Sequence, residues 1–272
     1  MYPEELAKDY GARCLLCRVS HPHRPIPELS VVMPAYNEEA VLPHSLAEAV
    51  AVLGRLCDRW ELVVVDDGST DSTPAILAEA ARREPRLRVL THPTNLGYSA
   101  ALAHGFAACR LSAIFYTDAD AQFDLGDLRH AWPLLADSDM VAGWRRDRQD
   151  PWLRRFASRG FNLLQSAVLG VRARDVDCAF KLFRRSYFER VRLSSQGFLI
   201  DSELYARAAR AGLRVVQLPV THRARPGGRS SVRPATVGKT LLHLWRLFLD
   251  LRREAAAPET LWPSSVPRRP AS

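Results

Sequence analysis

Two aspartates separated by one residue, Asp118 and Asp120, directly follow the apolar run 113–117 (AIFYT). In an extended segment, residues i and i+2 point to the same side, so both carboxylates can face one ion. Hard oxygen ligands of this kind select Mg²⁺ or Mn²⁺, and such an ion in turn bridges phosphate oxygens. The pair therefore predicts a divalent-cation site that acts on a phosphorylated ligand.

Two further acidic segments also come at the ends of apolar runs. The run 29–33 leads into 34–39 (PAYNEE), and the run 61–65 leads into 66–71 (DDGSTD). Asp, Gly and Ser are common turn formers and helix caps, which is the alternative interpretation for any one segment. Acidic side chains at one edge of a sheet repel each other unless a cation or a donor-rich ligand lies among them. Three such segments together therefore favour a binding site.

Short β-type runs alternate with helical segments along most of the chain. We expect strands at 29–33, 61–65, 87–90, 113–117, 140–143, 179–183 and 215–220. We expect helices at 42–56, from a hydroxyl cap at 72–73, and at 99–109, 127–136, 152–169 and 202–211. Apolar strands that alternate with helices indicate a single α/β domain with a mostly parallel sheet and helices on both faces. Ligands then bind beyond the carboxyl ends of the strands.

The composition limits the class of partner. Of 272 residues 47% are hydrophobic and 25% charged, which suits a domain with a substantial core. The net charge of +8 favours polyanionic partners such as nucleic acid, anionic lipid headgroups or phosphorylated substrates. The arginines are scattered and form no basic face studded with aromatic residues, so we expect no nucleic-acid partner.

The cysteines and the start of the chain indicate a reducing compartment. The five cysteines are an odd number, and the polar, acidic N-terminus does not resemble a signal peptide, which predicts a cytoplasmic protein. Cys57, Cys109 and Cys178 lie in apolar patterns typical of a core. Zinc binding by Cys14, Cys17, His21 and His23 is an alternative, but ligand pairs this close strain a tetrahedral shell. We therefore interpret residues 1–27 as an N-terminal extension.

The last part of the chain predicts an amphipathic helix at 236–254. One polar stripe runs along it, formed by Lys239, His243, Arg246, Asp250 and Arg253. The apolar run 241–251 would be about 16 Å long as a helix, too short for a hydrocarbon core of ~30 Å. The helix can instead lie in the membrane interface with its aromatic residues buried. Packing on the catalytic domain or on a second subunit is the alternative. Residues 255–272, rich in proline and serine, are expected to be a disordered tail.

Taken together, these motifs resemble the family 2 glycosyltransferases of the GT-A fold. The matching segments are 31–39 (VVMPAYNEE), 63–73 (VVVDDGSTDST), 95–97 (NLG) and 117–124 (TDADAQFD). Segments 175–185 (DVDCAFKLFRR) and 198–220 look like the branch that contains dolichyl- and polyprenyl-phosphate sugar synthases. The resemblance covers residues 28–235 and implies a single GT-A domain there.

The resemblance also implies roles for individual residues. The nucleotide-sugar pocket would contain Pro34, Ala35, Tyr36, Asn37, Glu38, Asp66, Asp67, Asp118, Ala119 and Asp120. Asp118, Asp120 and Gln122 would hold the metal ion and the diphosphate. The acceptor phosphate would meet Arg145, Arg225 and Arg229, although Ser231 replaces the lysine that ends the family's basic loop.

The implied reaction is an inverting, metal-dependent transfer of a hexose from a GDP- or UDP-linked sugar to a polyprenyl or dolichyl phosphate. Such an enzyme would lie peripherally on the inner face of the membrane. An acceptor phosphate is already anionic, so a general base is dispensable. If the acceptor is a hydroxyl of a polysaccharide or soluble glycan, Asp201 or Glu203 becomes the candidate base, and a helix N-cap is the alternative role for Asp201. A non-catalytic nucleotide-binding protein is the remaining interpretation.

Overall fold

One twisted sheet organises the computed structural model, which describes residues 25–146, 160, 164–165, 167–171, 173–194, 197–224 and 237–254. Within these residues, seven strands have the order β3-β2-β1-β4-β6-β5-β7. All neighbouring strands pair in parallel except β6, which is antiparallel to both β4 and β5. The strands are β1 (Ile26–Ala35), β2 (Cys57–Asp66), β3 (Leu87–Thr91), β4 (Ala113–Tyr116), β5 (Met140–Arg145), β6 (Lys181–Arg184) and β7 (Val215–Val220).

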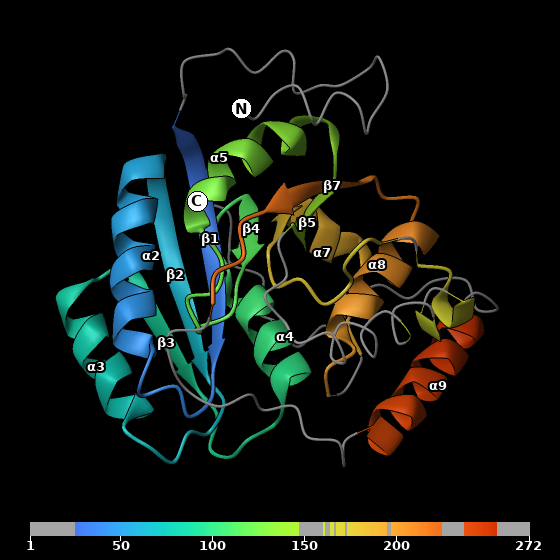
Figure 1. Cartoon of the computed structure of the whole chain (residues 1–272), viewed down its shortest axis with the longest axis horizontal. Helices are drawn as coiled ribbons and strands as arrows, with labels where there is room; N and C mark the ends of the chain where they lie inside the picture. Colours follow the sequence, from blue (N-terminus) through green and yellow to red (C-terminus); the bar gives the residue numbers. More distant parts are fainter. Residues whose placement is uncertain are drawn as a thin grey trace, which may run out of the picture.

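Helices cover the sheet on both faces, with α2 and α3 on one side of β1 and β2 and α4 on the other (Figure 1). The described helices are α2 (Leu42–Leu56), α3 (Thr73–Arg83), α4 (Tyr98–Ala108), α5 (Leu128–Ala131), α7 (Arg185–Arg190), α8 (Ile200–Arg210) and α9 (Val237–Glu254). The 3-10 segments η2 (Leu125–Asp127) and η3 (Trp132–Asp137) flank α5. The predicted α/β class with a mostly parallel sheet is confirmed.

The sequence explains the burial of the central strands. Every residue of β1 from Leu29 to Ala35 is buried, as a parallel sheet covered on both faces requires. Gly105 allows α4 to approach this sheet closely, because a Cβ there would lie 2.4 Å from Cγ1 of Val32. This close packing fixes α4, and hence Tyr98 at its first position, relative to the carboxyl end of β1.

Several local expectations were wrong. The helix expected at 127–136 is divided into η2, α5 and η3, because Pro133 lies in the first turn of η3 and cannot continue an α-helical ladder. Ser72 is at the N-cap of α3 but its hydroxyl makes no capping hydrogen bond, and Asp71 accepts from the N–H of Thr73 instead. β1 already begins at Ile26, inside the expected extension, and α7 was not predicted.

The C-terminal helix α9 packs on the domain. Leu244, Leu247 and Leu251 are buried, and Arg210 of α8 donates a hydrogen bond to the backbone carbonyl of Leu251. This confirms domain packing for one face of the helix. Another face stays open to solvent, with Leu241 44%, Leu242 49% and Trp245 56% exposed. In the part of the chain that the structure describes, no helix combines the length and hydropathy that crossing a bilayer requires.

Some predictions fall on residues that are not described. These are the zinc alternative at Cys14, Cys17, His21 and His23, the basic residues Arg225 and Arg229, the tail 255–272 and most of the helix expected at 152–169. The described end of that last segment, 167–169, is helical. Cys57, Cys109 and Cys178 are buried free thiols, as predicted.

Candidate active site

The three acidic segments meet at one edge of the sheet, as predicted. They follow β1, β2 and β4, and β1 pairs in parallel with both other strands, so the three carboxyl ends lie side by side. Ala35 is in register with Asp66, and the N–H of Asp67 donates to the carbonyl of Ala35 (2.9 Å). The N–H of Thr117 donates to the carbonyl of Val32 (3.1 Å). Backbone hydrogen bonds therefore hold the loops against each other.

The first two loops are also joined through side chains. Oδ1 of Asn37 accepts from the N–H of Thr70 (2.8 Å), and the N–H of Asn37 donates to Oγ of Ser69 (3.0 Å). The N–H of Glu38 donates to Oγ1 of Thr73 (2.9 Å). Asn37 also has a positive φ of 53°, a conformation that costs free energy outside glycine. The Asn37 side chain, predicted to bind nucleotide, therefore shapes the wall of the site.

Asp66 and Asp67 have different environments. Oδ1 of Asp66 accepts from the N–H of Ser69 (3.0 Å), whereas its buried Oδ2 has no hydrogen-bond partner in the structure. A buried carboxylate oxygen without a donor carries a free-energy penalty that a ligand donor could remove. This is the environment expected of a nucleotide-binding residue.

Asp67 instead anchors the turn 95–97. Its oxygens accept from the N–H groups of Leu96 and Gly97 (2.8 Å each) and from Nδ1 of His92 (2.7 Å). Nε2 of His92 in turn lies 2.8 Å from Nδ1 of His104. No spacing in the sequence links His92 and His104 to each other or to the acidic loop, so their sequence positions predict no role for them at this site. Asp67 therefore positions the turn that begins α4.

The loop after β4 presents the acidic pair. Oδ1 of Asp118 accepts from the hydroxyl of Tyr98 (3.0 Å), and Oδ1 of Asp120 accepts from the N–H of Gln122 (3.2 Å). Ala119 is buried, and its carbonyl accepts from Oγ of Ser45 (2.6 Å). Ala121 has a positive φ of 56°. Strained backbone of this kind concentrates at ligand sites, where the surrounding structure holds it in place.

The electrostatics of the pair fit a bound cation. Burial, and then the charge of Asp120, raises the pKa of the Asp118 carboxyl to about 7. A divalent ion would relieve both effects, and carboxylate and amide oxygens suit Mg²⁺ or Mn²⁺. Among the described residues, no group of three or more His, Cys, Asp or Glu side chains could hold a metal. Further ligands would therefore come from the amide of Gln122, phosphate oxygens or water.

The raised pKa of Asp118 predicts pH-dependent metal binding. Below pH 7 this carboxyl carries a proton that a cation must displace, and above pH 7 it is ionised and ready to bind. The dissociation constant for Mn²⁺, measured by titration calorimetry, should be roughly tenfold weaker at pH 6 than at pH 8. Asp118→Asn should bind weakly at both pH values. Equal affinity of the wild-type protein at pH 6 and pH 8 would contradict this prediction.

Arg145 is the last residue of β5 and is held by Asp175. Its Nε and one Nη lie 2.6 Å and 2.7 Å from the two carboxylate oxygens. This bidentate pair fixes the plane of the guanidinium. Burial, and then the charges of Asp201 and Asp175, raises the pKa of nearby Asp177 to about 6. Arg145, predicted to meet the acceptor phosphate, is therefore a rigid cation at the end of β5.

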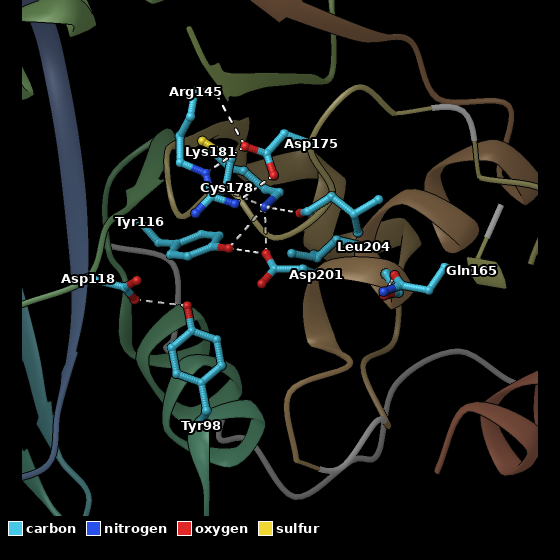
Figure 2. A network of polar contacts seen from close by, with 12 residues as sticks. Tyr98, Tyr116, Asp118, Arg145, Gln165, Asp175, Cys178, Lys181, Asp201 and Leu204 are labelled. Atoms are coloured by element: carbon cyan, nitrogen blue, oxygen red, sulfur yellow. Dashed lines mark hydrogen bonds and ion pairs between the residues drawn. The ribbon is translucent and has the colours of Figure 1, made fainter. Parts of the chain in front are cut away.

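The two candidate bases on α8 have different surroundings. The N-cap of α8 is Leu199, so the alternative N-cap role for Asp201 is wrong. Oδ1 of Asp201 accepts from Nζ of Lys181 (2.5 Å) and from the hydroxyl of Tyr116 (Figure 2). Glu203 is fully buried and accepts from Nε of Arg207 (2.6 Å) and the N–H of Ser194 (2.8 Å). The carboxylate of Glu203 therefore holds the backbone at Ser194. Asp201 instead belongs to the hydrogen-bond network that contains Lys181 and Tyr116.

Comparison with known proteins identifies the family. Residues 30–192, which contain the three acidic loops, match the model of "Glycosyl transferase family 2". The chain belongs to this family. It is a glycosyltransferase with the GT-A fold.

Relatives with named functions support this membership. The glycosyltransferase is 31% identical over 232 residues to a dodecaprenyl-phosphate galacturonate synthase of Rhizobium johnstonii, covering 84% of this chain and 68% of the relative. It is 32% identical over 211 residues to a dolichyl-phosphate beta-glucosyltransferase of Trichomonas vaginalis, covering 71% of this chain and 64% of the relative. The chain thus spans about two thirds of the length of these relatives.

A solved structure supports the fold of the glycosyltransferase. Glucosyl-3-phosphoglycerate synthase of Mycobacterium tuberculosis, crystallised with Mn²⁺, UDP-glucose and phosphoglyceric acid, aligns with a TM-score of 0.59 at 20% identity. The alignment covers 90% of this chain and 89% of the other. At this identity the likeness concerns the fold alone.

Proposed function

We propose that this glycosyltransferase transfers a hexose, with inversion, from a UDP- or GDP-linked sugar to a polyprenyl or dolichyl phosphate. The main support for the proposal is the acidic pair Asp118 and Asp120 at the carboxyl edge of the sheet. Burial and the charge of Asp120 raise the pKa of the Asp118 carboxyl to about 7, as expected of a site that binds a cation. The names of two relatives, which state polyprenyl or dolichyl phosphate sugar transfer, supply the acceptor class.

Asp118 and Asp120 would hold Mg²⁺ or Mn²⁺, with the amide of Gln122 close by. When bound, such an ion offsets the negative charge that develops on the leaving diphosphate, which stabilises the transition state by several kcal/mol. Nε2 of Gln122 donates to the carbonyl of Arg223 (3.2 Å), which orients the amide. Tyr98 donates to Oδ1 of Asp118 and so fixes that carboxylate.

The loops after β1 and β2 would bind the nucleotide. An N–H of the base would supply the donor that Oδ2 of Asp66 lacks. Tyr36, whose side chain is 39% exposed, offers a ring beside this loop for the base or ribose. Pro34, Ala35 and Glu38 complete this wall, which Asn37 and Asp67 hold in shape.

The acceptor phosphate would meet the arginines. Because a phosphate is already anionic at neutral pH, attack on the anomeric carbon requires no general base. Arg145, held by Asp175, would orient the phosphate through its remaining N–H groups. Arg225 and Arg229 would add charge from the basic loop. Attack from the face opposite the leaving diphosphate inverts the anomeric centre.

An acceptor assay tests the proposal. The full chain is incubated with MnCl₂, radiolabelled UDP-glucose, UDP-galacturonic acid or GDP-mannose, and a short polyprenyl phosphate. We expect label in the lipid fraction with at least one donor, and none when the matched polyprenol without phosphate replaces the acceptor. Absence of lipid product with every donor, or transfer only to a glycan hydroxyl, would contradict the proposed acceptor.

The exposed face of α9 predicts binding to a membrane surface. Leu241, Leu242 and Trp245 are solvent-exposed in the first half of the helix, and its last turn contains Arg252 and Arg253. Transfer of such side chains into the interface stabilises the bound state by about 1.5 kcal/mol each. Leu241→Ser with Trp245→Ser should lower the partition coefficient on anionic vesicles at least about tenfold.

A matched control uses an exposed leucine elsewhere. Leu96 is 52% exposed and belongs to the turn 95–97 and not to α9, so Leu96→Ser should leave vesicle sedimentation unchanged. If the α9 double variant sediments with vesicles as well as wild type does, the helix is not the membrane contact.

A further inference from the structure

Lys181, the first residue of β6, is fully buried. Lysine is almost never buried without partners, since the charged ammonium loses its hydration. Nζ of Lys181 lies 2.5 Å from Oδ1 of Asp201, 3.1 Å from the hydroxyl of Tyr116, 2.6 Å from the carbonyl of Cys178 and 3.0 Å from the carbonyl of Val176. These acceptors account for all three N–H donors of the ammonium.

Asp201 divides its two oxygens between different surroundings. Oδ1 takes both Lys181 and Tyr116, whereas no described residue donates a hydrogen bond to Oδ2. Figure 2 shows the second oxygen on the side of the carboxyl that faces away from Lys181. Asp201 lies in the first turn of α8, where the helix dipole favours a negative charge. The structure therefore holds this carboxyl through Oδ1 and leaves the other oxygen for a ligand.

The network also reaches the acidic pair. Tyr98 donates to Asp118, and Tyr116 donates to Asp201 (Figure 2). Burial, and then the charges of Asp118 and Asp201, raises the pKa of both tyrosine hydroxyls, so these four groups lie close together. Asp201 is therefore close to the acidic pair, since its charge contributes to the raised pKa of Asp118.

We propose that Lys181 is a positioning residue that acts through Asp201. Together with Tyr116 it fixes Oδ1 of the carboxylate, so that Oδ2 accepts a hydrogen bond from a hydroxyl of the transferred sugar. Such a hydrogen bond strengthens as positive charge develops on the sugar in the transition state. The inference rests on the proposed function, because it requires a sugar donor at the acidic pair.

The test combines turnover with nucleotide binding. Lys181→Met keeps the length of the side chain and removes its charge, so kcat should fall about 100-fold with the donor that wild type accepts. The affinity for UDP or GDP with MnCl₂, measured by titration calorimetry, should stay within about threefold of wild type, because neither nucleotide contains the sugar. The kcat of Lys181→Arg should be at least about tenfold higher than that of Lys181→Met, since arginine restores the cation.

A double-variant cycle separates action through Asp201 from a general loss of structure. Asp201→Asn should lower kcat to a similar extent, and Lys181→Met with Asp201→Asn should be no slower than the slower single variant. The double variant also contains no unpaired buried charge, so it provides a folded protein if Lys181→Met alone does not fold. Losses that multiply in the double variant would overturn the proposal.

Arg207→Met is the matched control. It also removes the cation of a buried ion pair, with Glu203 on the same helix α8, but this pair lies outside the network of Asp201. It should lower the melting temperature and keep kcat within about threefold. A Lys181→Met enzyme as fast as wild type would refute the positioning role of Lys181 and leave the proposed function standing. The same holds for a variant that loses UDP and GDP binding together with turnover. Wild-type protein without transfer to any acceptor would instead refute the proposed function.

Discussion

Asp120→Asn should lower kcat by about 1,000-fold or more and leave the fold intact. The size of the effect follows from the several kcal/mol that a cation bound to the leaving diphosphate contributes. The substitution keeps an amide oxygen that can still accept from the N–H of Gln122, so the loop retains its hydrogen bond. It removes the negative charge that a divalent cation requires. Asp118→Asn should lower kcat to a similar extent. It should also leave the fold intact, because an amide oxygen can still accept a hydrogen bond from Tyr98.

The measurement is kcat at saturating MnCl₂ together with the melting temperature. Asp124→Asn is the matched control from the same segment, since its carboxylate caps η2 through the N–H of Gly126 (2.8 Å) and pairs with Arg223. It should keep kcat within about threefold. A folded Asp120→Asn enzyme with wild-type turnover would remove the cation assignment.

Asp67→Ala should lower the free energy of unfolding by about 3–5 kcal/mol. Asp67 is 3% exposed and accepts three hydrogen bonds, from Leu96, Gly97 and His92. Alanine leaves the part-buried N–H groups of Leu96 and Gly97 and the buried Nδ1 of His92 without this acceptor, and it removes the anchor of the turn that leads into α4. Turnover should fall as well, because Tyr98 at the start of α4 contacts Asp118.

Urea unfolding at pH 7.5 measures the effect of Asp67→Ala. Asp58 on β2 is an exposed aspartate of the same strand, and Asp58→Ala should change the free energy of unfolding by less than about 0.5 kcal/mol. Asp67→Asn should be intermediate, since one amide oxygen can replace only part of a carboxylate. A loss below about 1 kcal/mol for Asp67→Ala would show that the turn 95–97 has other supports.

The sheet and the acidic edge were predictable because they depend on local patterns. Runs of valine and other apolar residues place β1 and β2, and parallel pairing then brings their carboxyl ends together. The start of β1 was missed because of Pro27. This proline is tolerated because β1 pairs only with β2 there, and its pairing with β4 begins at Ser30.

The network of Asp201 was harder to predict. Lys181 and Asp201 come from β6 and α8, and no periodicity in the sequence shows that their side chains meet in the core. The sequence alone leaves both Asp201 and Glu203 as candidate bases, because it does not show which of the two side chains faces the site. With α8 starting at Ile200, Asp201 and Glu203 are two residues apart on a helix and point in nearly opposite directions. Only one of them can therefore face the site.

We propose that the carboxylates of Asp118 and Asp120 bind a divalent cation that contacts the diphosphate of a nucleotide sugar. A crystal of the full chain grown with MnCl₂ and UDP or GDP tests it through the anomalous signal of manganese. We expect a manganese peak bonded to at least one of the two carboxylates and to a diphosphate oxygen. Nucleotide bound with no manganese at this pair, or with both carboxylates turned into the interior, would contradict the account.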